Sequence, residues 1–130
     1  MEKLNRLNFA DIAEKVMLSM QTEDRRGNKV IKFTTSKIRN MLTMVNGLYN
    51  DLLKNRDEIL SDDLKGTIQY IKMRFAYEAG REKNVKEFIE KANLMKYLDD
   101  IGDSREKAMI FCNYMEALVA YRKYYGGEDR

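Results

Sequence analysis

Four side chains suited to binding phosphate groups recur at helical spacing in the stretch YIKMRFAYEAGREK, residues 70–83. They are Tyr70, Arg74, Tyr77 and Arg81. At about 100° per residue they fall within about 60° of one another on a helical wheel. Guanidinium groups hold phosphates through paired hydrogen bonds, and tyrosine rings can pack or hydrogen-bond beside them. The bland alternative is that the tyrosines pack on a neighbouring helix while Glu78 pairs with the arginines. The residues alone leave both interpretations open.

A second polar face is predicted on the helix that begins near residue 35. Its members are Arg39, Thr43, Asn46 and Asn50, spaced i, i+4, i+7 and i+11. A merely solvated helix face usually carries Lys and Glu, which form helices better than Asn or Thr. A row of hydrogen-bonding groups with little like-charge repulsion suits a phosphate backbone or a polar subunit surface. An idle surface remains the alternative.

Positive charge is concentrated in one segment. The chain has a net charge of +3, yet residues 25–39 hold six basic and no acidic residues. Residues 1–24 carry three basic and five acidic groups, and residues 40–130 carry fifteen and sixteen. Such clustering creates a local positive field that suits a polyanionic partner, although a solvated basic loop has the same composition.

The composition removes several classes of enzyme. With no histidine and one cysteine, the chain has no Ser-His or Cys-His nucleophile pair and no imidazole or thiolate metal cage. Cys112 lies in the apolar stretch MIFCNYM, where a buried structural thiol is expected. We therefore expect no catalysis and no cofactor.

One enzymatic alternative is compatible with the sequence. Asp11 with Glu14, and Glu87 with Glu90, each place two carboxylates on one helix face. Paired acids from two helices can hold Mg²⁺ for nucleotide hydrolysis. The spacing is common on helix surfaces, and neighbouring lysines weaken the case further.

Length and composition predict a single helical domain spanning residues 1–130. The chain is 44% apolar and 35% charged and lacks proline, which favours long helices in a normal globular balance. No run approaches the ~18 apolar residues of a membrane span, and the first residues lack a signal-peptide core. We expect a cytoplasmic protein that does not contact a membrane.

Apolar periodicity predicts an all-α fold, a compact bundle of about five helices. The expected helices cover Phe9 to Met20, residues 34–36 to about Asn55, Ser61 to about Gly80, Asn84 to Leu98, and a last helix ending near Tyr124–Tyr125. Val30 and Phe33 lie in a stretch that favours a brief extended segment. The last helix is expected to begin with a capping box formed by Asp103 and Glu106.

The apolar arcs predict which helix sides face the core. The second helix is expected to bury a broad arc and the third a narrower one. The residues are Ile38, Met41, Leu42, Val45, Leu48, Tyr49, Leu52 and Leu53 in the second helix, and Leu64, Ile68, Ile71, Phe75 and Ala79 in the third. The tyrosine-rich last helix, with Tyr114, Tyr121, Tyr124 and Tyr125 beside Arg122 and Lys123, is typical of a core or a protein interface.

Three segments in combination resemble a known family. They are TTSKIRNMLTMVNGLYN, IKMRFAYEAGREKNVKEFIEKANLMKYLDDIG and FCNYMEALVAYRKYYGG. From about residue 30 onward the chain is similar to the small α-helical subunit of type III-A, or Csm-type, CRISPR effector complexes.

The resemblance implies a non-catalytic subunit that lines the path of the target RNA and of its duplex with the guide RNA. It also implies several copies stacked in a filament beside the other subunits of the complex. By motif position it makes Lys37, Arg39, Arg74 and Arg81 candidate RNA contacts, with Tyr77 supporting the arginines. The alternative is a helical protein–protein interaction module that touches no nucleic acid.

Overall fold

The computed structural model describes residues 2–127 and has a predominantly helical fold. The elements, in chain order, are α1 (Phe9–Met20), β1 (Thr22–Glu23), β2 (Lys29–Val30), α2 (Thr35–Lys54), α3 (Asp62–Arg81), α4 (Lys83–Lys91), α5 (Leu94–Ile101) and α6 (Arg105–Tyr125). The all-α prediction is confirmed, with six helices in the described residues in place of about five.

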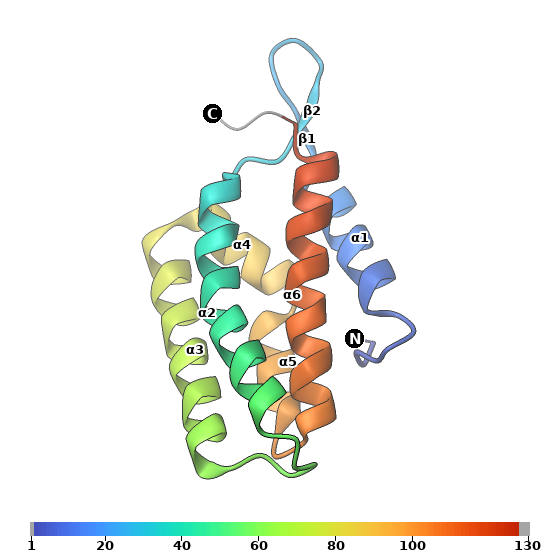
Figure 1. The fold of residues 1–130 in the computed structure, drawn as a ribbon. Coiled ribbons are helices and arrows are strands. Elements are labelled where there is room, and N and C mark those ends of the chain that lie inside the picture. Colours follow the sequence, from blue (N-terminus) through green and yellow to red (C-terminus); the bar gives the residue numbers. More distant parts are fainter. Residues whose placement is uncertain (1, 128–130) are drawn as a thin grey trace.

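The long helix α6 holds the bundle together. It packs against α1, α2 and α5, while α3 packs against α2, α4 and α5 and forms one edge of the molecule (Figure 1). Buried apolar side chains from all six helices make one core cluster. The predicted faces of α2 and α3 supply much of it, because each helix repeats its apolar residues at helical spacing.

Some of the predicted core positions turn outward. Leu53 is 42% exposed, so its assignment to the core was wrong, whereas Leu42, Tyr49 and Ala79 are only partly buried and pack on the core from its rim. Leu52 already fills the last core position of α2, and Leu53 is rotated from it by one residue. The apolar arc predicted from the wheel was therefore slightly too broad.

The predicted fourth helix is two helices. Asn93 has a left-handed backbone, with φ 55°, and it separates α4 from α5. Asparagine tolerates this conformation better than most residues. Ala92 and Leu94, on either side of Asn93, are both fully buried, so each of the two short helices keeps an apolar face on the core.

Serine side chains start two of the helices. Ser61 Oγ accepts a hydrogen bond from the Leu64 N–H at 3.2 Å, which confirms the expected start of this helix at Ser61. Ser104 Oγ accepts from the Lys107 N–H, also at 3.2 Å, so the cap of α6 is Ser104. The predicted capping box at Asp103 and Glu106 was wrong by one residue.

A short hairpin projects from one end of the bundle (Figure 1). β1 and β2 pair antiparallel, which adds a two-stranded ladder that the sequence indicated only as a brief extended segment. One Asp24 carboxylate oxygen accepts hydrogen bonds from the backbone N–H groups of Arg26, at 2.8 Å, and Asn28, at 2.9 Å. Gly27, with φ 80°, completes the turn in a conformation that favours glycine.

Candidate nucleic-acid interface

The cationic segment 25–39 forms the hairpin end of the molecule. Four of its basic side chains are exposed on the hairpin and on the segment that follows it: Arg25, Arg26, Lys29 and Lys32. The first turn of α2, the last turn of α3 and the start of α4 lie at the same end (Figure 1). The fold therefore adds charges from residues beyond 39 to a segment that is already basic.

A shallow hollow at this end joins three elements. It is lined by Lys32, Phe33, Thr34, Lys37, Glu82, Lys83 and Asn84. Lys37 Nζ lies 2.9 Å from Glu82 Oε1, and both side chains are about one-third to two-fifths exposed. One glutamate against three lysines leaves the lining net positive, and an exposed pair of this kind contributes little to stability.

The arginine stripe on α3 is built around one tyrosine and one glutamate. The guanidinium carbons of Arg74 and Arg81 lie 5.1 Å and 5.5 Å from the centre of the Tyr77 ring. The same two guanidiniums lie 3.8 Å and 3.5 Å from Glu78 Oε1. The structural alternative for the stripe is met in part, because both arginines pair with Glu78, whereas Tyr70 and Tyr77 are more than half exposed. The two cations share this one carboxylate. The cluster keeps a net positive charge on a surface where Tyr77 is exposed.

The polar face of α2 is exposed along its whole length. Arg39, Thr43, Asn46 and Asn50 all lie on the solvent side, as the spacing predicted. Thr43 Oγ1 donates to the Arg39 carbonyl oxygen at 2.9 Å, which keeps its lone pairs available as acceptors. Within residues 2–127 no acidic side chain pairs with the Arg39 guanidinium.

The structure brings some of the predicted residues together and leaves others apart. Lys37 pairs with Glu82, the residue that directly follows Arg81, so Lys37 and the end of α3 lie at the same end of the bundle. Arg74 lies two turns before Arg81 in α3, and both guanidiniums contact Glu78 and Tyr77. No described contact links Arg39 to this group, and it stands alone on α2.

A buried arginine positions the hairpin, and no local sequence pattern indicates it. Arg122 is 1% exposed; its Nε donates to the Phe33 carbonyl oxygen at 3.0 Å and its NH2 group to the same oxygen at 2.8 Å. The Ile31 N–H in turn donates to the Gly126 carbonyl oxygen at 3.1 Å. The end of α6 therefore fixes the segment 31–34 that leads from the hairpin into α2.

The tyrosines of α6 divide between core and surface. Tyr114 is fully buried and donates to the Ala92 carbonyl oxygen at 2.8 Å; burial raises its pKa. Tyr125 donates to Glu14 Oε2 at 2.6 Å, and this hydrogen bond to a carboxylate raises the pKa of Tyr125 to about 12. Only Tyr124 is largely exposed. Most of these rings therefore support the fold and leave little aromatic surface on α6.

The carboxylates considered for Mg²⁺ do not form a metal site in the described part of the chain. Glu14 accepts a hydrogen bond from the Tyr125 hydroxyl, and Glu87 Oε1 lies 3.9 Å from Lys91 Nζ. Across residues 2–127, no three His, Cys, Asp or Glu residues come together in a way that could hold a metal ion. In the same residues, no helix is both long and apolar enough to span a membrane.

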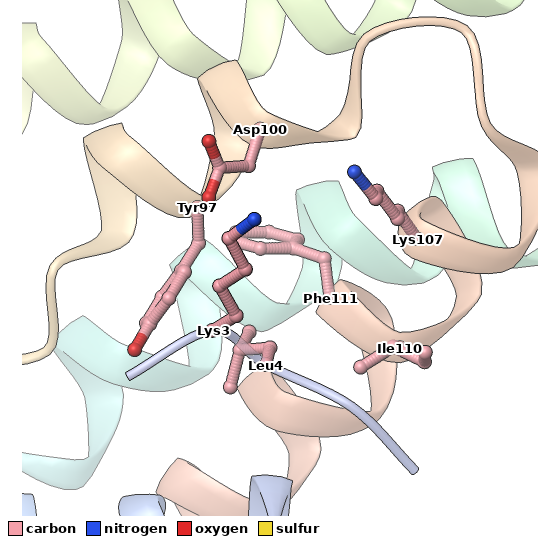
Figure 2. Close-up of a pocket in the computed structure, with 7 residues that line it drawn as sticks. All are labelled: Lys3, Leu4, Tyr97, Asp100, Lys107, Ile110 and Phe111. Carbon is pink, nitrogen blue, oxygen red and sulfur yellow. The ribbon is translucent and has the colours of Figure 1, made fainter. Parts of the chain in front are cut away.

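A small cavity lies on the far side of the bundle, where the N-terminal segment crosses α5 and α6 (Figure 2). Its volume is about 90 Å³, which admits a few water molecules and is too small for a nucleotide. The lining residues are Lys3, Leu4, Tyr97, Asp100, Lys107, Ile110 and Phe111. Tyr97 closes one side and donates to the Glu2 carbonyl oxygen at 2.7 Å, which ties down the N-terminal segment.

Comparison with known proteins decides the family. The profile of the type III-A Csm2 family matches residues 13–128. The chain belongs to this family.

Csm2 relatives agree over most of their length. A protein of Streptococcus thermophilus, described as CRISPR system Cms protein Csm2, is 44% identical over 124 residues, 94% of each chain. The protein of the same description from Enterococcus italicus is 39% identical over 92% of this chain and 88% of its own. A third, from Mycobacterium tuberculosis, is 39% identical over 76% of this chain and 80% of its own. The predicted resemblance to the small subunit of type III-A CRISPR systems is confirmed.

Proposed function

We propose that this Csm2-family chain is a non-catalytic subunit that holds target RNA, and its duplex with the guide RNA, by the phosphate backbone. One observation carries the proposal: the cationic segment 25–39 lies at the same end of the bundle as the last turn of α3, where Arg81 shares the Tyr77 ring with Arg74. Cations on a preformed surface suit backbone contact, and base pairing with the guide then supplies sequence specificity.

In this proposal each predicted residue has a distinct part. Arg39 meets a phosphate directly, since no described acid neutralises it. Arg74 and Arg81 exchange part of their contact with Glu78 for a phosphate, while Tyr77 holds both guanidiniums in place. Lys37 does the same at Glu82. The other subunits of the effector complex and further copies of the chain in a filament are the proposed protein partners, in the cytoplasm.

The test removes three of these cations together. In the assembled complex, the triple variant Arg39→Ala, Arg74→Ala and Arg81→Ala is expected to weaken target-RNA capture. It should also flatten the dependence of log K on log[salt] by about 2, because each phosphate of a single strand that is no longer neutralised removes roughly 0.7 from the slope. Filter binding over a series of salt concentrations measures both quantities.

A matched control removes as much charge elsewhere. Arg6, Arg56 and Lys96 are exposed and lie outside the proposed interface, so their triple alanine variant should retain both affinity and salt slope. An unchanged salt slope in the Arg39, Arg74 and Arg81 variant would contradict the assignment of these residues to RNA contact. An equal loss of affinity in both triple variants would contradict it as well.

The second candidate is a protein–protein module that never touches nucleic acid. The Glu78 and Glu82 ion pairs favour it, because they partly neutralise the arginines and Lys37. Co-purification with co-expressed guide-RNA-binding subunits, before and after nuclease treatment, separates the two. Complete retention after nuclease, with no crosslinking of the chain to RNA, would support the second candidate.

A further inference from the structure

Helix α3 lies at the edge of the bundle, and no other described element lies outside it (Figure 1). Its outer face carries an exposed apolar seam. The seam consists of Gly66, Tyr70, Met73, Tyr77 and Gly80, spaced alternately by four and three residues. This is the spacing of a helix that packs against another helix. Tyr70, Met73 and Tyr77 are 58%, 56% and 53% exposed, a large share for three neighbouring large side chains.

The two glycines of the seam are not required by the chain's own packing. A Cβ atom added at Gly66 or Gly80 would meet no other atom within 4 Å, and neither residue has a positive φ. Glycine is among the least favourable residues inside a helix. What these positions do allow is the close approach of an external helix, with a large side chain seated over each glycine.

We infer that the outer face of α3 binds the same face of a second copy of this chain, with the two helices antiparallel. Asp63 and Arg81 are 18 residues apart, which is five turns, so they lie on the same side of the helix at opposite ends. An antiparallel pair centred between Tyr70 and Met73 places Arg81 of each copy beside Asp63 of the other. The same register sets Tyr77 over Gly66 of the second copy.

The contact is small, so the dimer is weak. A helix of 20 residues is about 30 Å long, and one pair of such helices buries less than the ~800 Å² per partner of a standard interface. The inference goes beyond the proposed function and limits it, because Arg81 cannot hold a phosphate while it faces Asp63 of a second copy. Self-association of the free chain and RNA contact by α3 then exclude each other.

The glycines give the sharpest test. Gly66→Gln and Gly80→Gln together should raise the melting temperature through better helix propensity, yet raise the dimer dissociation constant by about tenfold or more. Gly47→Gln is the matched control, since Gly47 is also exposed within a helix, α2, with no atom near an added Cβ. It should stabilise the chain and leave the dimer unchanged. Sedimentation of the purified chain without RNA, from about 1 µM to 1 mM, measures the equilibrium.

Charge reversal tests the register. Asp63→Lys and Arg81→Glu should each weaken self-association, whereas an equimolar mixture of the two variants should form a heterodimer in which both pairs are restored. A chain that stays monomeric at every concentration overturns the inference, as does a dimer unaffected by the glycine variants. Loss of RNA binding without any effect on sedimentation assigns the face to RNA alone, and also overturns it. The sedimentation measurements use no RNA, so the proposed RNA contact can fail or stand independently of self-association.

Discussion

Tyr77 occupies the centre of the α3 cluster because of where its neighbours fall along the helix. Arg74 precedes it by three residues and Arg81 follows it by four, so both guanidiniums reach its ring from adjacent turns. An exposed cation–π contact contributes about 0.5–1 kcal/mol and restricts the arginine side chain. The ring is therefore better suited to orienting two arginines than to stacking on a base.

The prediction for Tyr77 separates these two parts. Tyr77→Phe keeps an aromatic ring beside both guanidiniums and should retain RNA capture by the assembled complex. Tyr77→Ala removes the ring and should weaken capture by roughly threefold to tenfold, because both cation–π interactions disappear with it. Equal losses in both variants, measured by filter binding, would show that the hydroxyl touches RNA.

Cys112 is a structural thiol, as the apolar stretch around it predicted. It is buried, and burial raises the pKa of the Cys112 thiol from 9.0 to about 12. A thiol-specific reagent at pH 8 should therefore modify the native chain far more slowly than the urea-unfolded chain, because the thiolate is the reactive form. Rapid native labelling would contradict the burial.

The raised pKa of the Cys112 thiol also makes the free energy of unfolding depend on pH. Below about pH 9 the thiol is neutral in both folded and unfolded chains, so its contribution to stability is fully present. Between about pH 9 and 12 only the unfolded chain loses the proton, and stability falls by up to about 1.4 kcal/mol per pH unit. Urea titrations of wild type and Cys112→Ala at pH 8 and 10.5 should show a smaller alkaline loss in the variant; equal losses would assign the effect to the tyrosines.

At the scale of elements, the end of α6 fixes the hairpin. Arg122 donates to the Phe33 carbonyl oxygen from inside the core, and the Gly126 carbonyl accepts from the Ile31 N–H. The Gln21 side chain adds a hydrogen bond to the Tyr125 carbonyl oxygen at 2.9 Å. Segments roughly ninety to a hundred residues apart in the chain are thus joined by buried and partly buried hydrogen bonds, which hold the base of the basic hairpin in the fold.

Arg122→Met should therefore destabilise the chain by about 2–4 kcal/mol, since it leaves a buried carbonyl without its charged donor. Hydrogen exchange should accelerate first in residues 22–34. Lys123→Met, on the exposed side of the same turn, is the control and should be close to neutral. Uniform acceleration across the chain would mean that Arg122 supports the whole core and not the hairpin in particular.

Gly126 depends on the same arginine. A Cβ added there would lie 1.8 Å from an Arg122 guanidinium nitrogen and 2.3 Å from the Arg122 backbone carbonyl oxygen. Gly126→Ala should therefore be costly in wild type and only partly relieved beside Arg122→Met, because the clash with the backbone oxygen remains. A double-mutant cycle by urea unfolding measures this coupling.

Most of the elements could be predicted from the sequence because their signals are local. The start of α3 and the end of α6 follow from Ser61 and from the glycine at 126, which the capping preferences of these residue types identify. The break at Asn93 was missed because the apolar pattern continues through it, and only the backbone shows the left-handed residue. Asp103 was predicted as the cap because Glu106 follows it at capping-box spacing, whereas the neighbouring Ser104 is the cap in the structure.

At the scale of the whole molecule, only part of the candidate interface could be predicted from the sequence. The charge of segment 25–39 and the α3 stripe are local patterns, and both were found. The Lys37–Glu82 pair and the buried Arg122 join residues far apart in the chain, so no spacing rule could place them. Their effect is to gather separate cationic patterns at one end of the bundle.

Under the proposed function, the exposed basic hairpin would guide approaching RNA by its positive field. Arg25 and Arg26 lie at the exposed turn, and no described acidic side chain pairs with either. Unpaired surface cations mainly accelerate association, because their field acts before contact and is screened by salt. We predict that Arg25→Ala with Arg26→Ala slows RNA association by the assembled complex several-fold at low salt and leaves dissociation nearly unchanged.

Stopped-flow association at two ionic strengths checks this, with Arg56→Ala and Lys96→Ala as the charge-matched control away from the hairpin. The difference between the two double variants should shrink as salt shortens the screening length to about 8 Å at 0.15 M. A faster dissociation in the hairpin variant would instead mean that these arginines remain bound to phosphates in the complex. The hairpin would then belong to the contact surface itself, alongside Arg39 and Arg81.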